Sequence, residues 1–424
     1  MTDYDVLVIG GGPGGLAVAI SATKEGSKVL LIEREARLGG ILKQCIHDGF
    51  GLLRFGEKLS GPEYVERFED EFHELSIDCE LQTFVTSIEK TGGDFHVYAV
   101  NGRGVQEYRA KAMVLATGCR ERTAKQIFIH GTRPAGVLTA GTAQHFVNLM
   151  GQMPARNCVI LGSSDIGLIM ARRLTLEGAK VLGVYEVKPV PSGLTRNLVQ
   201  CLEDYDIPLY LSHTVTRVFG TGRLTGVEIA RVDEHMRPIP GTQRRVDCDT
   251  LILSVGLIPE NEMAESLGVP LDPKTKGPFC DNRFMTGVEG IFSCGNATHV
   301  NDLVDYVSES GEIAGKAAAS YQKRSRQEPG TERVLIEAAD SLQYLVPQRL
   351  DPGSDLSKVI LYFRSRRVLA EGTLTVTVDT RQIFARKYQN LKPPEMERLE
   401  MDFTGLGLTK ESKIQISIVE GGAV

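Results

Sequence analysis

The chain opens with an apolar run, a glycine-rich turn and a second apolar run. Residues 5–9 are apolar after the first position, residues 10–15 read GGGPGG, and residues 16–22 are again mostly apolar. This pattern predicts a strand, a tight turn and a buried helix in that order. A further apolar stretch at residues 28–32 predicts a second strand that ends at Glu33, which completes a βαβ unit.

The same order recurs near the middle of the chain. An apolar strand at residues 157–161 precedes a turn at 162–167, a helix that extends to residue 177, and a strand over 180–185 that ends at Glu186. The repeated order indicates an internal duplication of one supersecondary arrangement.

Short alternating segments follow the first unit. Residues 81–88, 95–100 and 106–110 predict antiparallel strands separated by Gly-Gly and Asn-Gly turns. The apolar run 112–118 then predicts a buried parallel strand. A hairpin-rich insert over 214–246, followed by another buried strand, stands at the corresponding place in the second unit.

The end of the chain changes from a helical to a strand pattern. A short strand and turn at 290–296 precede residues 303–321, whose apolar positions have helical spacing, with Asp302 as the expected N-cap. Residues 327–330 indicate a linker, and the alternating segments beyond it predict a β-sandwich-like domain over 331–424.

These patterns predict an α/β chain with two Rossmann-like dinucleotide-binding domains of three-layer ββα type and a C-terminal β-sandwich-like domain. A length of 424 residues exceeds what one hydrophobic core usually organises. The predicted domains are 1–118 with 262–326, 119–261, and 331–424.

The first glycine turn has the residues that an adenine dinucleotide needs. Gly10 permits the tight turn, Gly12 lets a pyrophosphate approach the backbone, and Gly15 lets the helix pack closely on the strand. The free N–H groups and the positive dipole end of the helix face the phosphates. Glu33, about 20 residues further on, can accept hydrogen bonds from a ribose.

The second turn departs from this pattern at its middle position. Gly162 and Gly167 are kept, but Ser164 replaces the middle glycine, and its Cβ narrows the gap through which a pyrophosphate meets the backbone. Glu186 favours a free ribose hydroxyl and therefore NAD(H) over NADP(H). Two interpretations stay open here: a functional second dinucleotide site, or a retained fold without its ligand.

Composition excludes several function classes. The net charge of -6 with no basic run argues against nucleic acid as a partner. No window is apolar enough to span a bilayer, and the chain starts with a strand instead of a signal peptide, so we expect a cytoplasmic protein without a transmembrane segment. Eight cysteines lack any CxxC spacing, so we expect no metal site and no cysteine-based cluster in this chain.

Over residues 1 to about 326 the chain resembles the flavoproteins of the pyridine nucleotide-disulfide oxidoreductase superfamily. Three separated elements carry the resemblance: the opening glycine turn, the turn at 116–118, and Gly295-Asn296. The resemblance implies FAD as cofactor, with NAD(H) as a candidate second cofactor. Asn296 stands where the family usually has Asp, and its amide oxygen can still accept a hydrogen bond from a ribitol hydroxyl.

The cofactor contacts that the resemblance implies are distributed over the whole chain. For FAD they are Gly10, Gly12, Gly15, Glu33, Gly40, Val85 through its backbone, Thr117, Gly118, Gly295, Asn296 and Val304. For NAD(H) they are Gly162, Ser164, Gly167 and Glu186. The helix that begins near Leu303 would direct its N-terminus at the flavin and stabilise the negative charge of the reduced ring.

The main departure from the superfamily follows Gly40. Disulfide reductases of this kind place a pair of cysteines soon after that position, whereas residues 41–51 contain Cys45 alone. A dithiol relay is therefore not expected. Cys45 and His47 lie on the loop that the resemblance brings near the flavin, where either could position a substrate or transfer a proton. The alternative is a loop cysteine and a surface or structurally bonded histidine.

Residues 44–51, together with 302–305 and the extra C-terminal domain, are similar to a narrower branch. Its members are FAD/NAD-binding subunits of multi-subunit dehydrogenases that act on glycerol 3-phosphate, opines and related secondary alcohols or amines. This similarity implies two partners, which are a companion flavoprotein and a small iron–sulfur subunit. It also implies a small-molecule substrate.

Three functional hypotheses follow. In the first, the chain is an FAD-dependent oxidoreductase subunit that moves electrons from a small secondary alcohol or amine to a downstream acceptor. In the second, it is an NADH-dependent flavin reductase that passes electrons to a partner protein. In the third, it is a non-catalytic electron-transfer and assembly subunit whose β domain docks partners.

Overall fold

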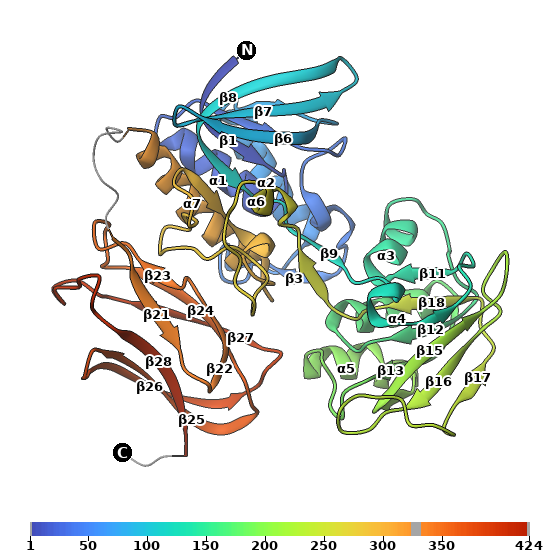
Figure 1. Cartoon of the computed structure of the whole chain (residues 1–424). Coiled ribbons are helices and arrows are strands. Elements are labelled where there is room, and N and C mark those ends of the chain that lie inside the picture. The colour runs from blue at the N-terminus through green and yellow to red at the C-terminus, as the bar shows by residue number, and fades with distance from the viewer. Residues whose placement is uncertain (1, 324–331, 422–424) are drawn as a thin grey trace. The chain divides into compact units, whose positions relative to one another are not determined.

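The computed structural model describes residues 2–323 and 332–421, so the linker predicted at 327–330 lies outside the described residues. The chain divides into two compact units (Figure 1), which are residues 1–119 with 259–424, and residues 120–258. The C-terminal strands, predicted as a domain of their own, fall in the first unit. The division into three domains therefore remains a prediction.

A seven-stranded sheet forms the centre of the amino-terminal part of the first unit. Its strands in spatial order are β5 (Asp78–Glu80), β2 (Val29–Ile32), β1 (Thr2–Ile9), β8 (Gly104–Leu115), β7 (Asp94–Asn101) and β6 (Phe84–Thr91), and β20 (Ile291–Ser293) pairs with β8 as well. The pairs of β1 with β2 and β8, of β2 with β5, and of β20 with β8 are parallel. The carboxyl ends of these strands therefore meet at one edge of the sheet, where nucleotides bind in such folds.

Strand β8 is longer than the sequence pattern predicts. The pattern suggested separate strands at 106–110 and 112–118, but one strand runs through both. Residues 104–110 pair with the antiparallel β7, residues 108–115 pair with the parallel β1, and residues 113–115 pair with β20. One strand thus joins the antiparallel and the parallel part of the sheet, which explains why its hydrophobic pattern changes along its length.

Three helices cover this sheet: α1 (Pro13–Lys24), α2 (Gly61–Glu74) and α7 (Val304–Lys323). Helices α1 and α7 pack side by side (Figure 1). Their contact depends on glycines of α7, because a Cβ on Gly311 would lie 2.4 Å from the carbonyl oxygen of Gly14. Small residues at such positions let two helix backbones approach closely, and this packing fixes α7 against the first glycine turn.

The second unit repeats the arrangement with a five-stranded parallel sheet. Its strands in spatial order are β11 (Val137–Thr139), β18 (Thr250–Leu253), β12 (Asn157–Leu161), β13 (Lys180–Glu186) and β14 (Leu209–Leu211). Its helices are α3 (Ala140–Asn148), α4 (Asp165–Leu176) and α5 (Thr195–Cys201). The hairpin-rich insert supplies three strands of a second sheet, which are β15 (His213–Phe219), β16 (Gly226–Arg231) and β17 (Arg244–Val246). The fourth strand, β10 (His130–Gly131), comes from an earlier segment and pairs with β15.

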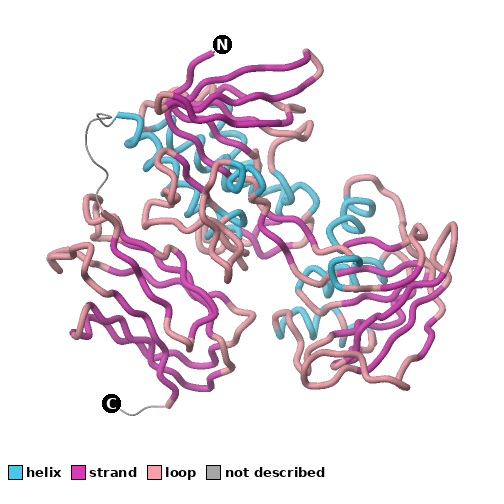
Figure 2. The backbone as a smooth tube through the Cα atoms, in the orientation of Figure 1, coloured by secondary structure: helices cyan, strands magenta, loops and turns pink. Residues whose placement is uncertain are grey.

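Strands provide all the regular structure of residues 332–421 (Figure 2). One sheet contains β23 (Arg349–Leu350), β21 (Val334–Ala338), β28 (Ile414–Glu420), β25 (Leu369–Val378) and β26 (Arg381–Leu391). The other contains β22 (Leu342–Val346), β24 (Val359–Ser365) and β27 (Met396–Met401). The two sheets enclose a hydrophobic core to which Leu361 and Phe363 belong.

The remaining elements are short. They are β3 (Asp48–Phe50), β4 (Leu59–Ser60), β9 (Cys119–Glu121), β19 (Leu257–Pro259), α6 (Glu262–Ser266) and the 3₁₀ turns η1 (Gly40–Gln44), η2 (Ala124–Ile127), η3 (Glu203–Tyr205) and η4 (Gly295–Ala297). Among the helices of the described ranges, none is both long and apolar enough to cross a membrane.

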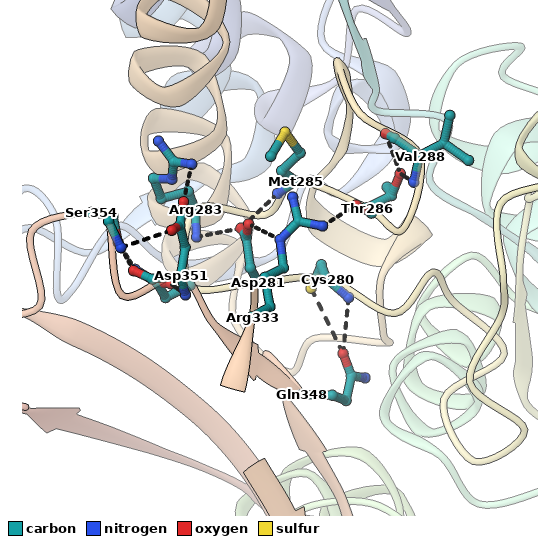
Figure 3. A network of polar contacts seen from close by, with 12 residues as sticks. Cys280, Asp281, Arg283, Met285, Thr286, Val288, Arg333, Gln348, Asp351 and Ser354 are labelled. Atoms are coloured by element: carbon teal, nitrogen blue, oxygen red, sulfur yellow. Dashed lines mark hydrogen bonds and ion pairs between the residues drawn. The ribbon is translucent and has the colours of Figure 1, made fainter. Parts of the chain in front are cut away.

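A buried polar network joins the C-terminal strands to the segment before β20 (Figure 3). The Asp281 side chain is fully buried, and its two oxygens accept hydrogen bonds from Arg333 Nε at 2.9 Å and from the Arg283 and Met285 N–H groups. Arg283 also forms an ion pair with Asp351. Burial raises the pKa of Asp281, while Arg333 and Arg283 act in the opposite direction. The network makes the C-terminal strands a continuous part of the first unit.

Candidate dinucleotide-binding sites

The first glycine turn leaves β1 at Gly10 and enters α1 at Pro13. Glu33, directly after β2, is 7% exposed, and its carboxylate accepts hydrogen bonds from the N–H groups of Gly11 at 2.6 Å and Glu35 at 2.8 Å. Each oxygen keeps a further lone pair, since a carboxylate offers about four acceptor sites. The Glu33 carboxylate is therefore held against the turn with lone pairs that can accept from ribose hydroxyls.

Glycine is present at the three positions of this turn for different structural reasons. A Cβ on Gly10 would lie 2.4 Å from Ala116 O, and one on Gly15 would lie 1.8 Å from Gly10 O, so the fold itself requires both. A Cβ on Gly12 would meet nothing nearer than Gly40 Cα at 3.9 Å. The fold does not need a glycine at position 12, whereas a pyrophosphate at the start of α1 does.

Gly40 belongs to a second turn that lies against the first. Gly39 N donates to Gly11 O at 2.8 Å, and Gly40 has a φ of 54°, in the left-handed region. A Cβ on Gly40 would lie 3.0 Å from Gly12 Cα. The two turns therefore approach each other backbone to backbone, and they leave the space above Gly12 free of side chains.

Three more predicted contacts lie where strands of the sheet end or bulge. Thr117 Oγ1, after β8, donates to Glu260 O at 2.6 Å, and Gly118 O accepts from Glu260 N at 3.0 Å. Val85 on β6 is 5% exposed, and the pairing of β6 with β7 is irregular just after it. The structure brings Thr117 and Gly118 to the same sheet edge as Gly10, because Ala116 packs on Gly10. The Glu260 contact was not predicted, since no sequence pattern links it to the turn.

Gly295 and Asn296 follow β20 at this edge. Gly295 N donates to Ser310 Oγ of α7 at 2.9 Å. Asn296 Oδ1 accepts hydrogen bonds from Asn301 N at 2.9 Å and Asn301 Nδ2 at 3.2 Å, while Asn296 Nδ2 donates to Cys119 Sγ at 3.5 Å. The amide oxygen that was predicted to accept from ribitol thus has two N–H partners. The amide nitrogen is the better placed group for a hydroxyl, because a thiol is a weak acceptor.

Two buried polar atoms follow this element without a partner in the described protein. They are Nε2 of His299, a residue 1% exposed, and Oδ1 of Asn301. Such atoms are uncommon in native proteins and indicate a missing ligand, water or ion. The open position at Gly12 and the buried acceptor Glu33 fit the residues of the first unit to FAD.

Helix α7 begins at Val304, one residue later than predicted. Asp302, the predicted N-cap, points its carboxylate toward the C-terminal strands: it pairs with Arg364, and Met396 N donates to it at 2.6 Å. Asp305 in the first turn accepts from Arg54 N at 3.0 Å. The start of the helix that was predicted to face the flavin is therefore held by two distant chain segments.

The two predicted catalytic residues have structural contacts. Cys45 is 8% exposed, its thiol donates to Ile41 O at 3.4 Å, and its carbonyl accepts from Gly61 N at 2.8 Å. The His47 ring packs on Phe50 with 5.0 Å between ring centroids. These contacts favour the structural interpretation of Cys45, and a catalytic role for either residue remains a prediction.

The second turn keeps the glycines that the fold requires. A Cβ on Gly162 would lie 2.0 Å from Ser254 O, and one on Gly167 would lie 2.8 Å from Gly162 O. Ser164, at the position of Gly12, forms a short hydrogen bond with the hydroxyl of Ser254. Glu186 accepts hydrogen bonds from Ser163 N at 3.0 Å and Ser163 Oγ at 2.6 Å. The glycine that serves a ligand is the one that has been replaced.

The start of α4 is also engaged by its own chain. Asp165 Oδ1, in the first turn, accepts from Leu194 N at 2.9 Å and Asn197 Nδ2 at 2.6 Å. A carboxylate at this place satisfies the helix dipole and repels a second anion. Both features weaken the second turn as a pyrophosphate site relative to the first.

Comparison with known proteins agrees with this geometry. The profile of the family described as "Pyridine nucleotide-disulphide oxidoreductase" matches residues 4–322. Hydrogen cyanide synthase subunit HcnB of Pseudomonas protegens is 26% identical over 340 residues, which are 75% of this chain and 68% of that protein. An opine oxidase subunit of Agrobacterium tumefaciens is 25% identical over 335 residues, covering 74% of this chain and 64% of that protein.

The fold is shared with solved structures. Thioredoxin reductase of T. acidophilum superposes with a TM-score of 0.62 and 23% identity, over 76% of this chain and 99% of that chain. The family match ends at residue 322, before the C-terminal strands. The names of the hydrogen cyanide synthase and opine oxidase relatives describe both as enzyme subunits.

Proposed function

Because the chain belongs to the pyridine nucleotide-disulphide oxidoreductase family and is a flavin-dependent oxidoreductase with FAD as cofactor, we propose that it is the FAD-carrying subunit of a multi-subunit dehydrogenase. Its donor is a small secondary alcohol or amine of the glycerol 3-phosphate or opine kind. The proposed partners are a companion flavoprotein and a small iron–sulfur subunit. Two relatives support this proposal by their names, since one belongs to an opine oxidase and the other to a hydrogen cyanide synthase.

One observation carries the choice between hypotheses: position 12 is open for a ligand and position 164 is not. Gly12 leaves space that the fold does not use, whereas the Ser164 hydroxyl bonds to Ser254. A site that binds FAD well and NADH poorly favours electrons that arrive from an organic donor or a partner protein. This argues against the NADH-dependent flavin reductase.

The cysteines support the same choice. All eight cysteines lie within the described residues and are free thiols, and none of them has the close sequence spacing of a redox pair, so the proposal includes no disulfide relay. Cys294, next to Gly295, is 1% exposed, and burial raises its pKa to about 12. A thiol of that pKa remains protonated and is a poor nucleophile. In this proposal the electrons leave the chain by transfer to another carrier.

The chain's own residues supply binding and electrostatics. Bound FAD supplies the two-electron chemistry. The first glycine turn offers N–H groups to the pyrophosphate, Glu33 accepts from the ribose, and the start of α7 stabilises negative charge on the ring. The third hypothesis, a non-catalytic assembly subunit, has these same features and differs only in where substrate is oxidised.

The decisive experiment is anaerobic reduction of the purified chain and of the complex that copurifies with it. We expect a yellow protein that glycerol 3-phosphate or an opine bleaches in the complex, and that NADH bleaches slowly or not at all. Rapid bleaching of the isolated chain by NADH would establish the reductase instead. Bleaching only after a separate companion flavoprotein has oxidised the donor would establish the assembly subunit.

A further inference from the structure

The three-stranded sheet β22-β24-β27 has two differently used faces. One face belongs to the core of the C-terminal strands, and the other packs on residues 299–309, around the start of α7. The residues of this second face are Tyr344, Val346, Ile360, Tyr362, Arg364, Met396 and Arg398. Cross-strand pairs place Arg364 between Tyr344 and Met396, which aligns these three side chains.

Arg364 is the central contact of this face. Its side chain is 11% exposed and pairs with Asp302, and its Nη2 also donates to Val300 O at 3.3 Å. Its Nε donates to Tyr344 Oη at 2.8 Å, and its Nη1 donates to Pro394 O. The guanidinium thus joins β22, β24 and the segment before β27 to Val300 and Asp302, which lie just before α7.

The position of Asp302 makes this contact electrostatically important. The N-terminal end of an α-helix is positive and would stabilise a negatively charged flavin ring. A carboxylate just before the helix is negative, so by itself it opposes that stabilisation. Asp302 directly follows Asn301, which donates two hydrogen bonds to Asn296. The Arg364 charge offsets the Asp302 charge where the predicted flavin contacts Asn296 and Val304 lie.

We propose that Arg364 is a positioning residue: through its pair with Asp302 it holds the start of α7 and raises the redox potential of the bound flavin. The inference rests on the proposed function, because it requires FAD in the first unit. It gives the C-terminal strands, which lie outside the family match, a role in the electron-transfer site.

A second contact of the same face provides a matched control. Arg398 forms two hydrogen bonds with the Glu309 carboxylate, at 2.9 and 2.7 Å, and Tyr362 Oη donates to it at 2.7 Å. Burial opposes the charged form of Glu309, but these bonds outweigh it and lower its pKa. Glu309 lies about 7.5 Å further along the helix than Val304, so its pair anchors the sheet without bordering the helix start.

The test compares R364Q, D302N, the double variant and R398Q in the full chain loaded with FAD. The readouts are the flavin midpoint potential by dye equilibration and thermal unfolding of the FAD-free protein. We expect R364Q to lower the potential by about 30 mV, which is tenfold in a two-electron equilibrium. D302N should raise the potential, the double variant should return it close to wild type, and R398Q should change it little.

The outcomes separate this inference from the proposed function. Equal shifts in R364Q and R398Q would show a general effect of domain docking and overturn the inference, as would unchanged potentials in R364Q and D302N. If R364Q does not fold, D302N decides alone, because Asn keeps one side-chain oxygen that can accept from Met396 N and replaces the charged oxygen that faces Arg364 with an amide nitrogen. A wild-type chain that retains no FAD would instead overturn the proposed function.

Discussion

Gly12 and Ser164 occupy the same position in two copies of one strand–turn–helix motif, and the fold constrains neither of them in the way it constrains the flanking glycines. The nearest atom to a Cβ on Gly12 is Gly40 Cα at 3.9 Å, whereas the Ser164 side chain bonds to Ser254. Duplication thus preserved the glycines that the backbone needs and left the ligand-dependent position free to change.

Replacement of Gly12 by Ala should separate ligand binding from folding. The added Cβ meets no protein atom nearer than 3.9 Å. The free energy of unfolding of the FAD-free variant should therefore lie within about 0.5 kcal/mol of the wild-type value. The same Cβ occupies space that a pyrophosphate needs, so the dissociation constant for FAD should rise at least about tenfold. Titration calorimetry with FAD and urea unfolding of the FAD-free protein measure the two effects.

The control for that variant is Gly15→Ala. Its Cβ would lie 1.8 Å from Gly10 O, so the backbone must move and the FAD-free protein should lose more than about 2 kcal/mol of stability. If G12A destabilises the FAD-free protein as much as G15A does, the distinction between fold-dependent and ligand-dependent glycines is wrong.

Ser164→Gly should improve NADH binding to the second unit. Glycine removes the Cβ and the hydroxyl that bonds to Ser254, and at the N-cap of α4 it costs only a few tenths of a kcal/mol relative to serine. The rate of anaerobic flavin bleaching at subsaturating NADH should rise about tenfold, in proportion to the gain in binding.

Ser164→Ala distinguishes the two parts of this effect. Alanine removes the hydrogen bond to Ser254 but keeps the Cβ, so it should leave NADH-dependent bleaching near the wild-type rate. A wild-type rate in S164G would mean that the Asp165 carboxylate, held by Leu194 and Asn197, is the stronger obstacle.

Local sequence patterns predicted the parts of this protein that depend on neighbouring residues. The turn from Gly10 to Gly15 and the acid at the end of the following strand follow from backbone geometry, which a short segment determines. Cys158 on β12 is 0% exposed, as expected for a continuous apolar run, which indicates a strand buried on both faces.

Contacts between distant segments could not be predicted in this way. Asp302 has the sequence signature of an N-cap, yet its carboxylate pairs with Arg364, 62 positions later. Strand β27 follows Pro393-Pro394 and has too short an apolar pattern to be recognised alone, although it supplies Met396 and Arg398 to the α7 contact. Pairing of this kind depends on how the C-terminal sheet packs, which no single segment encodes.

Asp281→Asn should weaken the junction between the C-terminal strands and β20. The amide keeps the acceptor for the Arg283 and Met285 N–H groups but leaves the buried Arg333 guanidinium without its counter-charge. Breaking a buried ion pair in this way costs about 3–5 kcal/mol, which urea unfolding should detect as a lower midpoint. A loss as small as that of the exposed pair variant Asp3→Asn would contradict a structural role for the network.

His299 gives the stability of the first unit a specific pH dependence. Its ring packs on Tyr344 and Tyr362, with centroid distances of 5.7 and 5.3 Å, and burial together with the nearby Arg364 charge lowers its pKa to about 3. The unfolded histidine binds a proton below about pH 6.5, but the folded one does not until about pH 3. The unfolded state therefore binds more protons in this window, and stability falls as pH falls.

His299→Phe should remove this dependence while it preserves the ring contacts with Tyr344 and Tyr362. Because other groups titrate alike in both proteins, the wild type should lose about 1.4 kcal/mol per pH unit relative to the variant below about pH 6.5. Urea unfolding of the FAD-free proteins at about pH 7.5 and about pH 5 measures the difference. Parallel stability profiles would mean that His299 gains a proton in the folded state, which requires a partner for the Nε2 atom that is unpaired in the described protein.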